Sequence, residues 1–163
     1  MKGFTTRIVH SDRQDVIEHG SLHKPVHATV AYGYEDAREL AAVFQCTQPG
    51  YTYGRQVNPT VDALQNKIST MEQGLQTVCF ATGMAAIGTM LFALLREGDH
   101  FVSSSFLFGN TNSLFNSFEV QGIDVSFVDA TSEAAVAAAI TEKTKLVFVE
   151  TIANPRTQVA ALT

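Results

Sequence analysis

The second part of the sequence predicts an α/β domain built on a mostly parallel sheet. From about residue 60, short apolar runs rich in β-branched residues alternate with segments of helical periodicity. The links between them are short, which is typical of strand–helix–strand units whose helices cover the faces of the sheet. Four strands are expected, over residues 77–81, 100–105, 123–128 and 145–150.

Two helices are expected before residue 100. The first ends near Gly74 and presents one apolar face. This face comprises Val61, Leu64, Ile68, Met71 and Leu75. The second helix covers residues 84–95 and is apolar all round, which predicts burial on most of its sides. Glu97 and Gly98 are expected to stop it.

Two further helices follow the second and third strands. Residues 110–120 place Leu114, Phe115 and Phe118 on one helical face, and residues 132–140 are rich in alanine. Each lies between two expected strands. This order is the strand–helix alternation that a parallel sheet requires.

The first sixty residues lack sustained periodicity, except over residues 36–44, which predict a short helix. Its apolar face comprises Leu40, Val43 and Phe44. Such a segment buries too little to fold alone, so residues 1–60 are expected to form an arm that lies against its own domain or a neighbouring subunit. Residues 61–163 are expected to be the first part of a larger domain. Because the chain stops soon after a strand, we expect it to be a fragment.

Composition narrows the possible functions. A chain of 163 residues with 45% hydrophobic and 17% charged residues is typical of a globular domain. Its net charge of −5 argues against nucleic acid as a partner, and its longest apolar stretch is too short to span a bilayer. Cys46 and Cys79 stand far apart in the sequence and form no metal-ligand pair. Because the sequence has no secretion signal, these two isolated thiols indicate the reducing cytoplasm.

The junction of the first strand and the second helix is the most informative candidate site. Gly83 and Met84 open the helix, where free N–H groups and the helix dipole favour an anion. Thr82 precedes them and can cap the helix. No lysine follows, so this is not a Walker phosphate loop, and Gly83 with Gly88 does not complete a dinucleotide fingerprint. The alternative is an ordinary capped helix start.

A second candidate is the loop that contains Tyr53 and Arg55. An arginine offers a planar fork suited to phosphate oxygens, and Tyr53 adds a hydroxyl donor beside it. The alternative is a packed surface loop. The following Asn58-Pro59-Thr60 is structural, because it ends the loop and opens a helix.

Two more candidates follow expected strands. Phe108 comes after the strand over 100–105 and offers an aromatic face, although a core phenylalanine is the commoner explanation. Glu150 ends the strand expected over 145–150 and Asn154 follows it, and a turn asparagine is the alternative there. Together the candidates offer hydrogen-bond donors that can bind an anion, an aromatic face and an amide. That set suits a planar, phosphorylated cofactor.

The ordered motifs resemble those of the Cys/Met-metabolism enzymes that depend on pyridoxal 5′-phosphate (PLP). The resemblance runs from about Thr6 to Pro155. The motifs that carry it are Tyr53-Gly54-Arg55, Asn58-Pro59-Thr60, Gly83-Met84-Ala85-Ala86 and Glu150 with Asn154-Pro155. The resemblance implies the aspartate-aminotransferase-like fold (fold type I), in a homo-oligomer that is a dimer of dimers with shared active sites.

The resemblance also implies roles for individual residues. Tyr53 and Arg55 match the pair that binds the PLP phosphate of a neighbouring subunit. Gly83 and Met84 are similar to the residues that bind the phosphate within the subunit. A second set would surround the cofactor ring, with Phe108 stacking on it, Asn154 near its 3′-oxygen and Glu150 in support.

The implied reaction is replacement of the γ-substituent of O-acetyl- or O-succinyl-homoserine by a sulfur nucleophile, in methionine and cysteine metabolism. Two departures bear on it. Phe108 stands where the family usually has tyrosine, which leaves a stacking face without a proton-carrying hydroxyl. None of the five lysines lies in the family's Schiff-base context, so the chain alone is expected to be inactive.

Three alternatives remain. The alternative within the family is a methionine or cystathionine γ-lyase. Outside it, the chain is a nucleotide-binding Rossmann-like domain, which the missing glycine fingerprint disfavours. The alternative without catalysis is a binding or assembly module.

Overall fold

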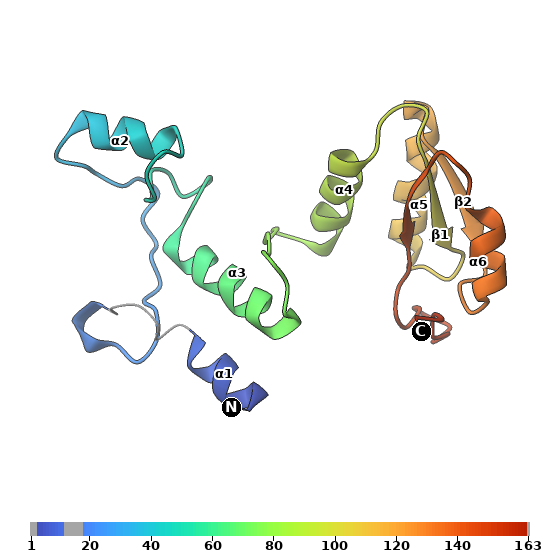
Figure 1. The fold of residues 1–163 in the computed structure, drawn as a ribbon, viewed down its shortest axis with the longest axis horizontal. Coiled ribbons are helices and arrows are strands. Elements are labelled where there is room, and N and C mark those ends of the chain that lie inside the picture. The colour runs from blue at the N-terminus through green and yellow to red at the C-terminus, as the bar shows by residue number, and fades with distance from the viewer. Residues whose placement is uncertain (1–2, 12–17, 163) are drawn as a thin grey trace. The chain divides into compact units, whose positions relative to one another are not determined.

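A computed structural model describes residues 3–11 and 18–162 of the chain (Figure 1). The chain divides into two compact units, unit 1 (Met1–Cys79) and unit 2 (Phe80–Thr163). Each unit is described by itself below. None of the helices in the described part of the chain is long and apolar enough to cross a membrane.

Unit 2 is organised around a three-stranded parallel sheet. Its strands are β1 (His100–Ser104), β2 (Asp124–Val128) and β3 (Thr144–Phe148), in the order β2-β1-β3. Figure 1 shows α5 (Gly109–Ser117) and α6 (Glu133–Ala139) on opposite sides of the strands. The predicted parallel sheet flanked by helices is confirmed.

The start of β1 is tied to both neighbouring strands by a buried histidine. The ring nitrogens of His100 lie 2.8 Å from the hydroxyl of Thr144 and 2.9 Å from the hydroxyl of Ser126. His100 is almost completely buried, so both ring nitrogens need these partners. The three strands are therefore linked at this end, where the pairing of β1 with β3 shifts by one residue between His100 and Phe101.

Helix α4 (Gly83–Leu94) begins where the sequence predicts but is less buried than predicted. Thr82 caps it by accepting the N–H of Ala85, and the chain leaves the helix at Leu95. Only Gly88 and Leu91 are buried within the helix, while Phe92 and Leu94 are 53% and 56% exposed. The prediction of burial on most sides is wrong, because unit 2 covers only one face of α4.

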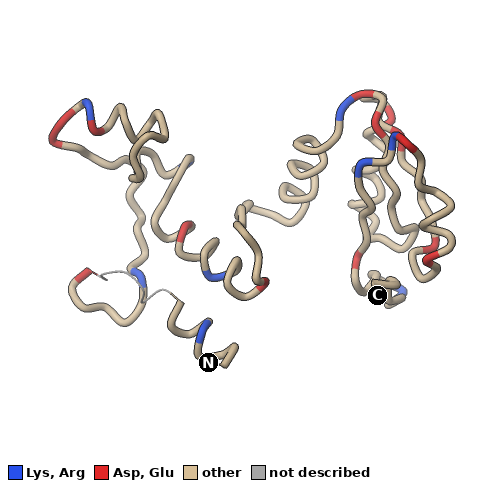
Figure 2. The backbone as a smooth tube through the Cα atoms, in the orientation of Figure 1, with Lys and Arg blue, Asp and Glu red and all other residues tan. Residues whose placement is uncertain are grey.

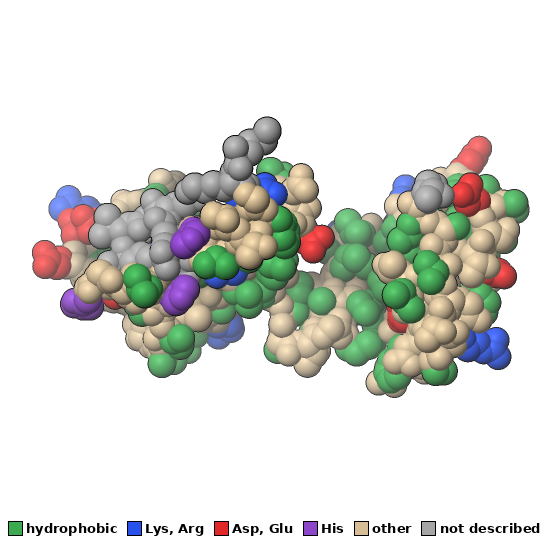
Figure 3. Space-filling model, turned by 90° about the horizontal axis from the view of Figure 1, so that it is seen from below, with side chains coloured by type: hydrophobic (Ala, Val, Ile, Leu, Met, Phe, Trp, Pro, Cys, Tyr) green, Lys and Arg blue, Asp and Glu red, His purple; other side chains and the backbone are tan. Residues whose placement is uncertain are grey.

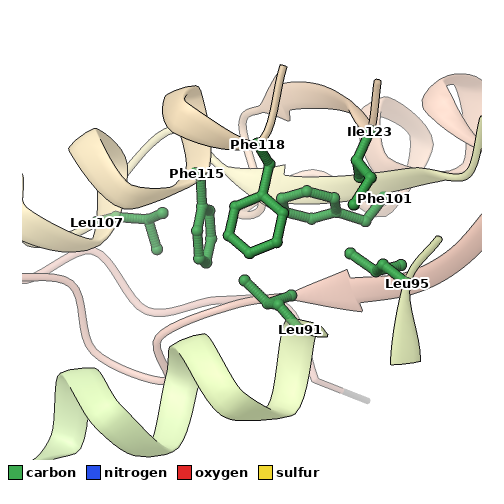
Figure 4. Packing of buried hydrophobic residues seen from close by; sticks show 7 residues of the cluster. All are labelled: Leu91, Leu95, Phe101, Leu107, Phe115, Phe118 and Ile123. Atoms are coloured by element: carbon green, nitrogen blue, oxygen red, sulfur yellow. The ribbon is translucent and has the colours of Figure 1, made fainter. Parts of the chain in front are cut away.

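The core of unit 2 lies between α4, α5 and the sheet (Figure 4). It comprises Leu91, Leu95, Phe101, Leu107, Phe115, Phe118 and Ile123. Phe115 of α5 meets Phe101 of β1 edge-on at 5.2 Å between ring centroids, and Phe118 belongs to the short 3₁₀ helix η3 (Phe118–Gln121). Edge-to-face aromatic pairs add to the energy of burial, so this cluster anchors α5 on the sheet.

The strand predicted over residues 77–81 does not form. Within the described residues these positions have no strand partner, and Val78 and Phe80 are exposed. A β-branched run becomes a strand only when a neighbouring backbone accepts and donates its hydrogen bonds. The prediction rested on composition, which does not provide that neighbour.

Unit 1 contains α1 (Phe4–Val9), η2 (Glu18–Gly20), α2 (Ala37–Phe44) and α3 (Pro59–Glu72). Helices α2 and α3 confirm the two helices predicted in this part of the chain. Asn58 caps α3 by accepting the N–H of Thr60, with Pro59 in the first turn, as predicted.

The apolar faces of these helices are mostly uncovered in unit 1. No residue of α3 is buried, and Val61 and Leu64 are 41% and 50% exposed. In α2 only Val43 is buried, and Phe44, on the face predicted to be apolar and covered, is 54% exposed. Helical spacing therefore predicted the helices correctly, but not what covers them.

Candidate functional site

The candidate site lies at the edge of the unit 2 sheet where the parallel strands end. The loop after β1 leads through Phe108 into α5, and the loop after β3 contains Glu150. The carboxylate Oε1 of Glu150 accepts the backbone N–H of Phe108 at 3.1 Å. Two segments separated by 42 positions in the sequence are thereby joined at this edge.

The first turn of α4 is linked to the first turn of α5. The hydroxyl of Thr111, which is 2% exposed, lies 3.9 Å from Sδ of Met84. Thr111 is three residues beyond Phe108, which directly precedes α5. Met84, Phe108 and Glu150 are therefore connected through the start of α5.

Two backbone donors at the start of α4 have no acceptor among the described residues. The side chain of Thr82 accepts the N–H of Ala85, and its carbonyl accepts the N–H of Ala86. The N–H groups of Gly83 and Met84 precede these and are not used by the helix itself. Apart from its chain neighbours and the backbone of its own helix, no described atom lies within 4 Å of the position that a Cβ would take on Gly83, so an anion can approach these donors.

Phe108 and Asn154 expose the flat ring and the amide that the sequence analysis selected. The side chain of Phe108 is 47% exposed, so one face of its ring can contact a ligand. Asn154 is exposed in a loop closed by a hydrogen bond from the N–H of Thr157 to the carbonyl of Ala153, 2.8 Å long. The peptide bond between Asn154 and Pro155 is cis.

A hollow of about 370 Å³ lies between the loops that follow β1 and β3. Its lining comprises Ser105, Phe106, Leu107, Ala153, Asn154, Pro155 and Arg156. Figure 3 views the molecule from the side of the strand ends, and hydrophobic side chains there alternate with polar groups on unit 2. Sequence reasoning gave no role to Ser105, Phe106 or Arg156, although each follows a strand end as Phe108 and Asn154 do.

A carboxylate that sequence reasoning did not consider also stands at this edge. Asp129 directly follows β2 and accepts the hydroxyl of Thr131 at 2.6 Å and its backbone N–H at 2.9 Å. These bonds, the hydroxyl bond most of all, hold the pKa of Asp129 below its ordinary value. Asp129 is therefore an ionised acceptor at neutral pH and not a proton donor.

The lysines of unit 2 lie at the opposite edge of the sheet. Lys143 and Lys145 are in the turn before β3 and at its start, and the ammonium of Lys145 lies 3.9 Å from Asp99. Figure 2 shows most basic segments of this unit near the starts of the strands. Neither lysine is among the residues that gather at the strand ends.

The loop predicted to bind phosphate lies in unit 1. The guanidinium of Arg55 stacks on the ring of Tyr53, 5.0 Å from its centroid. The loop is held by a 2.7 Å hydrogen bond from the N–H of Gly54 to the carbonyl of Val30. Arg55 is exposed, and its guanidinium forms no ion pair with the described residues. The loop therefore presents an exposed guanidinium, stacked on Tyr53, on a fixed backbone.

The structure thus brings Met84, Phe108 and Glu150 together and places Gly83 and Asn154 in the same unit. Tyr53 and Arg55 belong to unit 1. Among the described residues, no three His, Cys, Asp or Glu side chains gather as metal ligands would. The unit 2 residues can accept an anion and a flat ring. The unit 1 loop by itself presents an exposed cation.

Comparisons with known proteins agree with this chemistry. The model of a family described as "Cys/Met metabolism PLP-dependent enzyme" matches residues 5–163. An O-acetyl-L-homoserine sulfhydrylase from Corynebacterium glutamicum is 35% identical over 96% of this chain and 36% of its own length. An L-methionine gamma-lyase from Fusobacterium nucleatum is 34% identical over 88% of this chain and 37% of its own length. The chain thus spans about a third of the length of these curated relatives.

The fold matches solved structures over almost the whole chain. A putative O-acetylhomoserine (thiol)-lyase from Campylobacter jejuni superposes with a TM-score of 0.88 at 27% identity, covering 98% of this chain and 39% of that one. That crystal structure contains a pyridoxyl-lysine phosphate. The fold is therefore that of the PLP-dependent enzymes of fold type I.

Proposed function

The chain belongs to the Cys/Met metabolism PLP-dependent enzyme family, and we propose that the protein containing it replaces the γ-substituent of an activated homoserine with a sulfur nucleophile. The activated homoserine is O-acetyl- or O-succinyl-homoserine. The observation that carries the proposal is the connected set of Met84, Phe108 and Glu150 at the strand ends. The sulfhydrylase relative supports the choice of reaction.

The residues of unit 2 fit the cofactor of this family. The N–H groups of Gly83 and Met84, which lack acceptors among the described residues, would hold the phosphate. Phe108 would stack on the ring, and Asn154 would face its 3′-oxygen. When bound, PLP supplies an electron sink for the carbon skeleton of the amino acid.

Phe108 limits what the site itself can do with protons. Its ring offers a stacking surface, but it has no hydroxyl that could donate or accept a proton. Glu150 accepts the N–H of Phe108 and so fixes the backbone that carries this ring. We infer that Phe108 orients the cofactor and that other groups move the protons of the reaction.

The lysine that forms the Schiff base in this family is not expected from this chain. Lys143 and Lys145 lie at the wrong edge of the sheet, Lys24 and Lys67 belong to unit 1, and Lys2 lies outside the described residues. Because the chain spans about a third of its relatives' length, we propose that the lysine belongs to the remainder. The chain alone would then bind parts of the ligand without catalysing the reaction.

Arg55 and Tyr53 are proposed to complete the phosphate site of a neighbouring subunit. An exposed guanidinium stacked on a tyrosine, on a loop fixed by a backbone hydrogen bond, is suited to this task. It follows that the active protein is a homo-oligomer with shared sites, in which residues 1–60 act as the arm. Two free cysteines fit the proposed cytoplasmic location.

A γ-lyase that acts on methionine or cystathionine is the second candidate. The L-methionine gamma-lyase relative, 34% identical to this chain, favours it. The two candidates share the cofactor and differ in whether a sulfur nucleophile enters or 2-oxobutyrate is released.

The full-length protein loaded with PLP decides between them. O-acetyl- or O-succinyl-homoserine with sulfide should give homocysteine in a PLP-dependent manner. Formation of 2-oxobutyrate from methionine without added sulfide would favour the γ-lyase instead. If neither product forms, the proposed function is wrong.

A further inference from the structure

The hollow between the β1 and β3 loops has the size and composition of a small-ligand subsite. Its volume of about 370 Å³ falls within the range of small-molecule pockets. Phe106 and Pro155 give it apolar walls, and Asn154 and Arg156 give it hydrogen-bond donors. Such a mixture suits a short carbon chain that ends in a polar group.

The loop that carries Arg156 is held by its own backbone. The N–H of Thr157 donates to the carbonyl of Ala153 at 2.8 Å, and the N–H of Ala153 donates to the carbonyl of Gln158 at 2.9 Å. A bridge between Ile152 and Val159 closes the same turn. The backbone of Arg156 is therefore fixed at the rim of the hollow, while its side chain is exposed.

No carboxylate among the described residues pairs with the guanidinium of Arg156. Glu150, six positions earlier in the same connection, accepts the N–H of Phe108 instead. The sequence has 16 acidic and 11 basic residues, so acidic partners are plentiful elsewhere. The planar fork of five N–H donors thus remains available to an acceptor that enters the hollow.

We propose that this hollow binds a carboxylate group of the small-molecule substrate, with Arg156 as the specificity-determining residue. Guanidinium and carboxylate form two parallel hydrogen bonds, and the amide of Asn154 adds a donor beside them. The apolar walls accommodate the carbon chain next to the carboxylate. The identity of the substrate rests on the proposed function, whereas carboxylate binding by the hollow does not.

Two carboxylates of the proposed substrates share this chemistry. One is the α-carboxylate, which every amino-acid substrate carries. The other is the terminal carboxylate of a succinyl group, which the acetyl ester lacks. Recognition of the second would make Arg156 the residue that selects the acyl group.

A titration of the 163-residue chain tests the subsite without the cofactor. Succinate should shift the NMR signals of Phe106, Asn154 and Arg156, and Arg156→Gln should weaken its affinity about tenfold or more, because a charge-assisted pair is lost. Succinamide, the neutral analogue, should bind the original chain no more tightly than succinate binds the Arg156→Gln variant. Lys143→Gln removes one positive charge at the opposite edge and should leave the affinity unchanged.

Equal affinity of Arg156→Gln and the original chain for succinate would overturn the proposal, as would equal binding of succinamide. Arg156 is exposed, so the variant should keep the amide spectrum of the folded chain.

Kinetics of the full-length protein then identify the carboxylate. If Arg156→Gln raises the KM for O-succinyl-homoserine about tenfold and leaves that for O-acetyl-homoserine unchanged, the hollow binds the succinyl terminus. An equal rise in KM for both esters assigns the hollow to the α-carboxylate, and Arg156→Lys should restore only part of the lost affinity.

No change in KM with either ester overturns the proposed role of Arg156 in specificity. Absence of any PLP-dependent product from the unsubstituted protein would instead refute the proposed function, while the succinate titration still decides on the subsite.

Discussion

The two units use similar sequence patterns with different structural results. In unit 2 a cluster that includes Phe101, Phe115 and Phe118 is completely buried between helices and sheet. In unit 1 only Val43 and Thr52 are buried among the described residues, and no residue of α3 is. Apolar periodicity therefore specifies a helix and the face it will bury, but burial requires a second element to pack against that face.

The largest expected effect contrasts the core of unit 2 with the uncovered face of α3. Phe115→Ala should cost about 3–5 kcal/mol in the free energy of unfolding, because it removes a buried ring that contacts Phe101 and Phe148. Val61→Ala should cost less than about 0.5 kcal/mol, since Val61 is exposed and alanine has the higher helix propensity. Both values follow from denaturant unfolding of the chain monitored by NMR signals of each unit.

A cost for Val61→Ala that matched the cost for Phe115→Ala would break the comparison between the units. It would mean that the face of α3 is covered in solution, either by another part of the chain or by a second copy. Repeating the measurement at several protein concentrations separates these two cases.

The same contrast explains which parts of the fold the sequence predicts. Helices α3 and α5 follow from spacing and α4 from a continuous apolar run, and Asn58, Thr82 and Ser132 mark helix starts by local hydrogen bonds. These features depend on neighbours within a few positions. The strand predicted over 77–81 and the all-round burial of α4 depended on distant partners, and both predictions were wrong.

The candidate site shows the same division. The rule that ligands gather at the carboxyl ends of parallel strands selected Phe108, Glu150 and Asn154 from the sequence. The bond from the N–H of Phe108 to Glu150 and the contact of Thr111 with Met84 join residues 42 and 27 positions apart. No local pattern encodes such pairings, because they depend on the register of β1 and β3 and on how α5 packs beside α4.

An intermediate effect tests how the loops of the two units are held. In unit 2 the side chain of Glu150 holds the Phe108 loop, whereas in unit 1 the Tyr53 loop is held by backbone bonds, among them the bond from Gly54 to Val30. Glu150→Ala should lower the free energy of local opening by about 1–2 kcal/mol, seen as faster exchange of the Phe108 amide hydrogen. Glu150→Gln keeps an acceptor oxygen and should retain most of the protection.

The exchange of the Gly54 amide provides the comparison, because it should be unaffected by either change at Glu150. Glu142→Ala, in the turn before β3, is a matched loss of an exposed carboxylate and should leave the Phe108 amide protected. Protection of Phe108 that survives Glu150→Ala would show that other contacts hold this loop, and the positioning role of Glu150 would be lost.

The smallest expected effect compares two exposed aspartates, one in each unit. In unit 1 the side chain of Arg38 donates to Asp36 and, with the backbone N–H of Arg38, holds the pKa of Asp36 below its ordinary value. In unit 2 the neutral hydroxyl of Thr131 does the same for Asp129. Because folding lowers both pKa values, the stability they contribute is present above the ordinary carboxyl range and is lost as the pH falls below about 4.

Salt should separate the two aspartates, because Asp36 faces a charge and Asp129 faces a hydroxyl. Raising the ionic strength from about 0.01 M to about 1 M shortens the screening length about tenfold, so the pKa of Asp36 should rise towards its ordinary value. The pKa of Asp129 should change less, and Thr131→Ala should raise it at either ionic strength. NMR titration of the two carboxyl carbons measures both. Equal salt sensitivity would mean that a charge, and not the Thr131 hydroxyl, governs Asp129, since hydrogen bonds from neutral groups lack the long-range component that ions screen.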